Sequence, residues 1–115
     1  MIELTLPMPP SANRLWRKSG ARMHKSTQYT DWLRTAGYMA MAQHPEAITG
    51  PYRLSIQFMR PDKRKRDLDN RIKAINDLLQ TIGVIEDDSD CEVVTARWVT
   101  SGEPCTVWVE KSGVA

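Results

Sequence analysis

The sequence predicts a small single domain of the mixed α/β (α+β) class over residues 1–115, in which a mixed β-sheet carries two main helices. The chain of 115 residues is 41% hydrophobic and 26% charged, which suits one globular domain with a modest core. Short alternating stretches, the pattern of strands, are interspersed with two longer stretches of helical period. No apolar run approaches membrane-spanning length and no secretion signal opens the chain, so we expect no membrane contact.

The N-terminal half predicts a strand, a compact turn and a helix. Residues 2–6 alternate between apolar and polar, and the prolines that follow cannot continue a strand ladder. A Ser-Gly turn flanked by basic and aromatic residues comes next, and it favours either a small hairpin or an irregular loop. Ser26 can cap the N-terminus of a helix, and the segment of residues 44–51 is expected to end that helix. The apolar face of this helix is Tyr29, Trp32, Leu33, Ala36 and Ala40.

The C-terminal half predicts a second strand, a second helix and two final strands. Residues 52–58 alternate again. From residue 68 the period becomes helical for about 15 residues, and Gly83 is the expected C-terminal cap. The apolar stripe of this helix is Leu68, Ile72, Ile75, Leu79 and Ile82, with Leu78 beside it. Residues 92–100 and 105–111 then form two strands on either side of a Ser-Gly turn.

The two cysteines are predicted to stay apart. If the last two strands form a hairpin around Gly102, Cys105 lies opposite Val99. Cys91 then lies near Gly113. The sequence therefore predicts no disulfide, which agrees with a reducing, cytoplasmic location.

Charge is segregated along the chain, although the formal net charge is only +2. Residues 60–73 contain seven bases and three acids, whereas residues 86–92 contain five acids and no base. Segregated charge says more about partners than net charge does. The basic segment suits a polyanion.

Two acids follow the basic segment directly. Asp67 and Asp69 are expected in the cap and first turn of the second helix, and Lys73 lies four residues after Asp69 on the same side. Aspartate is favoured at helix starts in general, because it accepts bonds from free N–H groups and complements the helix dipole. One interpretation is therefore a capped helix with an exposed Asp69–Lys73 ion pair, worth a few tenths of a kcal/mol.

The acids after Gly83 favour a different interpretation. The helix is roughly 22 Å long at about 1.5 Å per residue, so Asp88 starts far from Asp69 along its axis. Either the chain doubles back from Gly83, or the acids of a second subunit complete the group. Three carboxylates in one small space require a cation, and their hard oxygens suit Mg²⁺ or Mn²⁺. A carboxylate cluster beside a basic segment is what metal-assisted phosphodiester hydrolysis needs, with Lys73 neutralising charge.

The central motif resembles that of a known family. In order come a strand, a Pro-Asp step, a basic loop, Arg-Asp-Leu-Asp-Asn, a helix with a lysine, and then Gly and Asp-Asp. These features occur in MRPDKRKRDLDNRIKAINDLLQTIGVIEDDSD, residues 59–90. Their order and spacing resemble the RusA family of Holliday junction resolvases, small endodeoxyribonucleases common in bacteria and their prophages. The opening LPMPPSANR, residues 6–14, is also similar to that family's.

The resemblance implies a RusA-like fold and a magnesium-dependent homodimer. Such an enzyme binds four-way DNA junctions and nicks two strands symmetrically. It implies that Asp67, Asp69 and Asp88 are catalytic metal ligands. It implies that Lys73 assists catalysis. The DNA-contacting residues implied are Ser11, Asn13, Arg14, Lys63, Arg64, Lys65, Arg66 and Asn70, the last of which also supports the site.

Two points stay open from the sequence. Glu86 stands where the family often has an apolar residue, so Asp87 rivals Asp88 as the third ligand. A non-catalytic basic module that binds DNA or junctions is the alternative function, because the basic loop and N-terminal arm suit it equally well. Uncompensated acids beside phosphate argue against that module. A structural protein that binds no nucleic acid leaves the charge segregation without a purpose.

Overall fold

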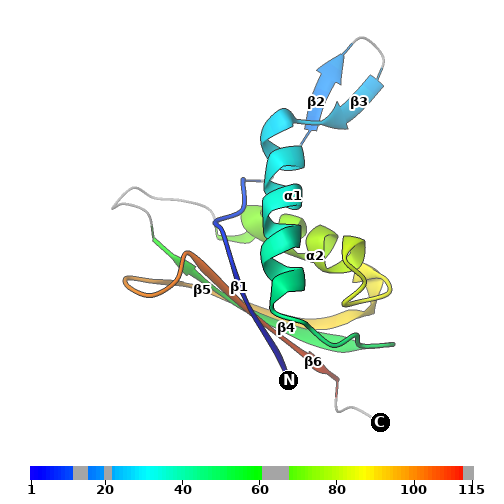
Figure 1. Ribbon diagram of the computed structural model, residues 1–115, viewed down its shortest axis with the longest axis vertical. Helices are drawn as coiled ribbons and strands as arrows, with labels where there is room; N and C mark the ends of the chain where they lie inside the picture. The colour runs from blue at the N-terminus through cyan, green and yellow to red at the C-terminus, as the bar shows by residue number, and fades with distance from the viewer. Residues whose placement is uncertain (12–15, 20–21, 61–67, 113–115) are drawn as a thin grey trace.

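The computed structural model describes residues 1–11, 16–19, 22–60 and 68–112. The strands are β1 (Ile2–Leu6), β2 (Trp16–Ser19), β3 (Arg22–Lys25), β4 (Tyr52–Met59), β5 (Cys91–Val99) and β6 (Cys105–Lys111). The helices are α1 (Thr27–Ala42) and α2 (Ile72–Thr81), with short 3-10 turns η2 (Asp69–Arg71) and η3 (Asp88–Asp90). Both helices lie on one side of the larger sheet (Figure 1). The predicted mixed α+β class with two main helices is therefore confirmed.

The larger sheet has the strand order β1-β6-β4-β5. β5 runs parallel to β4, whereas β6 runs antiparallel to both β4 and β1. The predicted hairpin of the last two strands is wrong, because β4 lies between them and pairs along both its edges. Cys105 consequently lies opposite Phe58 and Leu6 instead of Val99. Cys91 lies opposite Tyr52. Both thiols are free, as the sequence predicts.

The segment between β1 and α1 contains a hairpin, the first of the two predicted alternatives. β2 and β3 pair antiparallel in a two-stranded sheet of their own. Figure 1 shows this hairpin projecting beyond the N-terminal end of α1, away from the larger sheet. The hairpin therefore extends the helical side of the molecule.

The helix α1 starts and packs as its sequence predicts. The side-chain oxygen of Ser26 accepts a hydrogen bond from the backbone N–H of Tyr29 at 3.1 Å, which is an N-cap. The residues buried on its inner face are Tyr29, Trp32, Ala36 and Ala40. Leu33 packs against this core from a partly buried position.

The helix α2 is shorter than predicted, because η2 takes the place of its first turn. The core side of α2 is Ala74, Ile75, Leu78 and Leu79, all fully buried. Gly83 follows the helix with φ of 83°, a conformation that favours glycine. The next N–H, that of Val84, donates to the carbonyl of Leu79 at 2.9 Å. The chain therefore reverses at Gly83 and runs back towards the sheet.

The described helices are short relative to a bilayer. Within residues 1–11, 16–19, 22–60 and 68–112, no helix is both long enough and apolar enough to cross a membrane.

Candidate active site

The first group of predicted site residues lies where α2 begins. Asp69 opens the turn η2 and is exposed, and Asn70 follows it in a partly exposed position. Lys73 lies in the first turn of α2 with 54% of its side chain exposed. The ion pair formed by Lys73 is with Asp77, at 3.4 Å, and not with Asp69 as the capped-helix interpretation expects. Asp69 is therefore an exposed acid at the head of the helix, where Lys73 does not pair with it.

The second group lies in the turn η3, directly before β5. Asp87 is the N-cap of this turn, and its Oδ1 accepts a hydrogen bond of 2.9 Å from the N–H of Ser89. This bond lowers the pKa of Asp87 below its ordinary value, because it favours the charged carboxylate. Asp88 is exposed, and its own N–H donates to Oε1 of Gln80 at 3.3 Å. The acidic turn therefore lies against the last turn of α2.

The middle of α2 is tied to the sheet beside this turn. The hydroxyl of Tyr52 donates a hydrogen bond of 2.7 Å to Oδ1 of Asn76. Burial raises the pKa of Tyr52, and the neighbouring thiol of Cys91 and charges of Asp88 and Asp90 raise it further. The phenol is thus neutral and fixed, and it lies within electrostatic range of the acidic turn. α2, β4 and η3 therefore form one rigid support.

The N-terminal segment is tied to the head of α2. The guanidinium of Arg71 donates to the carbonyl of Pro9, and the indole of Trp32 donates to the carbonyl of Pro7 at 3.0 Å. Ser11 follows two residues after Pro9 and is partly exposed. This segment, which contains one of the predicted DNA-contacting residues, is therefore held beside the turn that carries Asp69.

In the structure Asp69 and Asp88 both lie beside α2, but at different points along it. Asp69 precedes α2, whereas Asp88 bonds to its last turn. Eleven residues from Asp69 to Gln80 correspond to about 16 Å of helix rise. Among the residues that the structure describes, no three His, Cys, Asp or Glu side chains gather closely enough to hold a metal ion.

The remaining predicted site residues lie outside the described ranges. They are Asn13, Arg14, Lys63, Arg64, Lys65, Arg66 and Asp67. The predicted ligand Asp67 and the basic loop therefore stay predictions from the sequence.

Sequence reasoning missed the residues that support the site. It assigned Tyr29 to the core, and it did not consider Asn76 or Asp77. Spacing offered one signal, because Asp77 follows Lys73 by four residues and so lies on the same helix face. No spacing signal points to the bond between Tyr52 and Asn76, since these residues lie 24 positions apart in the sequence.

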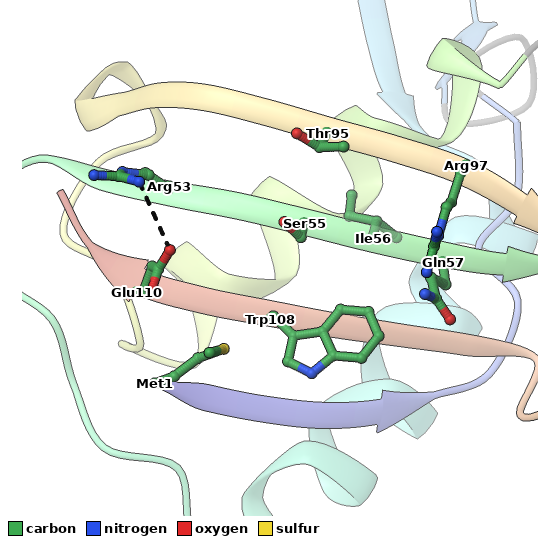
Figure 2. A pocket seen from close by; sticks show the side chains of 9 residues that line it. All are labelled: Met1, Arg53, Ser55, Ile56, Gln57, Thr95, Arg97, Trp108 and Glu110. Carbon is green, nitrogen blue, oxygen red and sulfur yellow. Dashed lines mark ion pairs between the residues drawn. The ribbon is translucent and has the colours of Figure 1, made fainter.

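A shallow hollow on the opposite face of the sheet is separate from these groups. It has a volume of about 430 Å³, and Arg53, Arg97, Trp108 and Glu110 are among its lining residues (Figure 2). Within it Arg53 lies 4.0 Å from Glu110, and the indole of Trp108 donates a hydrogen bond of 2.6 Å to Glu3. The predicted site residues that the structure describes do not line this hollow.

Comparison of this chain with known proteins points to one family. Residues 7–110 match the model of a family described as Endodeoxyribonuclease RusA. The crossover junction endodeoxyribonuclease RusA of Aquifex aeolicus (strain VF5) is 33% identical over 100 residues, which cover 85% of this chain and 79% of the relative. The protein of the same name from Escherichia coli (strain K12) is 37% identical over 99 residues, covering 84% and 79%. That of Enterobacteria phage 82 is 36% identical over the same shares.

Proposed function

Since the chain belongs to the RusA endodeoxyribonuclease family, we propose that it is a divalent-metal-dependent hydrolase that resolves four-way (Holliday) DNA junctions by paired, symmetric nicks. The observation that carries the proposal is the position of the acidic turn. Asp88 lies back against α2, the helix that begins beside Asp69. A protein that only binds DNA gains nothing from exposed acids held on such a support, because carboxylates repel phosphate.

We assign Asp67, Asp69 and Asp88 as ligands of a cation, Mg²⁺ or alternatively Mn²⁺. The exposed carboxylates of Asp69 and Asp88 are hard oxygen donors, which is the kind that these cations prefer. Asp88 is the better third ligand than Asp87, since one oxygen of Asp87 already caps the turn η3. The chemistry that a divalent cation supplies in such a site is stabilisation of charge on phosphate and activation of a water nucleophile.

The other residues hold the DNA in this proposal. Lys73 is half exposed near the head of α2, so its ammonium is available to neutralise negative charge on a phosphate oxygen. Ser11 contacts the DNA strand from the N-terminal segment, and Asn70 contacts it from the turn η2. The hydrogen bond from Arg71 to the carbonyl of Pro9 joins that segment to that turn. The other DNA contacts are assigned to Asn13, Arg14, Lys63, Arg64, Lys65 and Arg66. DNA binding through the lysines and arginines among these residues weakens as the salt concentration rises.

We further propose a homodimer, because two symmetric nicks call for two equal sites related by a two-fold axis. One chain holds Asp69 and Asp88 at different points of α2, about 16 Å of helix rise apart. We therefore expect Asp69 of one chain and Asp88 of the other to share a cation, and a cation site within one chain is the alternative. Mixing Asp69→Asn chains with Asp88→Asn chains separates these arrangements. A site shared across chains leaves one intact site in each mixed dimer and restores nicking. A site within one chain leaves both sites broken, and the mixture stays inactive.

The direct test is a four-way junction incubated with the protein in Mg²⁺ or in EDTA and run on a denaturing gel. We expect paired nicks in Mg²⁺ and none in EDTA. Asp69→Asn is expected to abolish cleavage while junction binding is kept or strengthened, because a negative charge near phosphate is gone. Asp31→Asn is the matched control, since Asp31 is an exposed acid on α1 that pairs with Arg34. Wild-type cleavage by Asp69→Asn contradicts the proposal.

A further inference from the structure

The carboxylate of Asp77 connects a buried tyrosine to the lysine of the proposed site. Its Oδ2 accepts a hydrogen bond of 2.5 Å from the hydroxyl of Tyr29 in α1. Its Oδ1 faces the ammonium of Lys73, 3.4 Å away. Each oxygen therefore has its own partner, and the two partners come from different helices.

The tyrosine end of this connection is rigid. Tyr29 is fully buried in the core, next to the cap of α1. Burial raises the pKa of its hydroxyl, and the bond to Asp77 and the negative charge there raise it further. The hydroxyl therefore keeps its proton over the working range of the protein and acts as a permanent donor to Asp77.

The lysine end faces a shallow hollow between the two helices. Its volume is about 360 Å³, and its lining includes Lys25, Leu33, Lys73, Asp77 and Gln80. An exposed ion pair at this helical spacing ordinarily holds a lysine weakly, because the long side chain loses entropy in the pair. Asp77 differs from an ordinary surface partner, since its side chain is only 23% exposed and is fixed by Tyr29.

We propose that Asp77 is a positioning residue, which Tyr29 fixes and which in turn holds the ammonium of Lys73 at the head of α2 for contact with DNA phosphate. This inference rests on the proposed function of Lys73. It assigns Asp77 a role outside the cation ligands. It also explains why a buried tyrosine points its hydroxyl at an acid on the neighbouring helix.

Three variants and one control test the inference by cleavage. Tyr29→Phe removes only the hydroxyl, and Asp77→Asn removes the charge while keeping an acceptor for Tyr29. Each is expected to slow single-turnover junction cleavage about tenfold, since small misplacements of a catalytic group cost this much or more. Junction affinity is expected to stay within about twofold of wild type. Tyr38→Phe, an exposed tyrosine on the same helix, is expected to cleave at the wild-type rate.

The third variant, Lys73→Gln, distinguishes positioning from a general structural effect. If Asp77 acts through Lys73, adding Asp77→Asn to Lys73→Gln lowers the residual rate no further. A wild-type rate for Asp77→Asn overturns the inference. An equal loss with and without Lys73 overturns it as well.

A measurement without DNA or metal separates this inference from the proposed function. NMR relaxation of the Lys73 side-chain ε-carbon reports how firmly the ammonium is held. Tyr29→Phe and Asp77→Asn are expected to make Lys73 clearly more mobile, whereas Tyr38→Phe leaves it unchanged. Unchanged Lys73 mobility in Asp77→Asn, which keeps the tie to α1, overturns the inference even if the protein cleaves junctions. Increased mobility supports it even if wild type cleaves nothing.

Discussion

The backbone N–H of Asp88 donates a hydrogen bond of 3.3 Å to the side-chain oxygen of Gln80, so the acidic turn lies against the last turn of α2. The chain reverses its direction at Gly83, which makes this contact possible. The φ of Gly83 is 83°, a backbone conformation that suits glycine better than other residues. The head of the same helix carries Asp69. A single packed helix therefore positions both acidic groups of the proposed site, one at each end.

Gln80→Ala is expected to slow junction cleavage about threefold to tenfold, because the turn that holds Asp88 loses its side-chain anchor. A net hydrogen bond contributes about 0.5–1.5 kcal/mol, which sets this range. Gln80 is exposed, so the thermal midpoint should change little. Single-turnover cleavage measures the effect, with Gln28→Ala as an exposed control on α1. An identical rate for both variants shows that the anchor does not matter.

Asp88→Asn and Asp87→Asn are expected to behave differently. The first removes a proposed ligand and should lower cleavage at least about 100-fold, the size of effect expected for a major electrostatic group. The second keeps a good capping oxygen for the N–H of Ser89, so cleavage should stay within about threefold. Cleavage rates on one junction substrate compare the two directly. The reverse order identifies Asp87 as the third ligand.

Tyr52→Phe is expected to destabilise the protein by about 1–2 kcal/mol, because the side chain of Asn76 loses the partner that it has at 2.7 Å. Urea unfolding at neutral pH measures this difference. Tyr38→Phe serves as the control, since Tyr38 is 72% exposed and should unfold like wild type. Equal stability of the two variants contradicts a structural role for the Tyr52–Asn76 bond.

The loss of stability at high pH is expected to be smaller in Cys105→Ala than in the wild-type protein. Burial raises the pKa of the Cys105 thiol from 9.0 to about 12 in the folded protein. The unfolded chain therefore loses this proton first, and the free energy of unfolding falls as pH rises from about 9 to about 12. The slope due to this thiol approaches about 1.4 kcal/mol per pH unit between these two pKa values. Urea unfolding at pH 8 and at pH 10.5 checks it, and parallel losses in both proteins contradict it.

Local patterns in the sequence were sufficient for most elements of the fold. The strand at residues 105–111, the N-cap at Ser26 and the C-terminal cap at Gly83 all depend on a few neighbouring residues. Alternation of apolar residues likewise predicts the side of β4 that is buried. These features follow from local backbone and side-chain chemistry, so one sequence reveals them.

Pairings between distant residues were not predictable in this way. β4 separates β5 from β6, although the turn between those two strands has hairpin composition, because strand order depends on the whole sheet. The bond from Tyr29 to Asp77 joins residues 48 positions apart. A tyrosine on an apolar helix face predicts burial, but nothing in its spacing predicts the partner of its hydroxyl.

The central claim is that Asp69 and Asp88 hold one and the same cation, within a chain or between two. Binding of Mn²⁺, measured by electron paramagnetic resonance on wild type, Asp69→Asn and Asp88→Asn, tests it most directly. We predict a wild-type site that each substitution weakens at least about tenfold, since each removes a charged ligand. Wild-type affinity for Mn²⁺ in either variant contradicts the shared site.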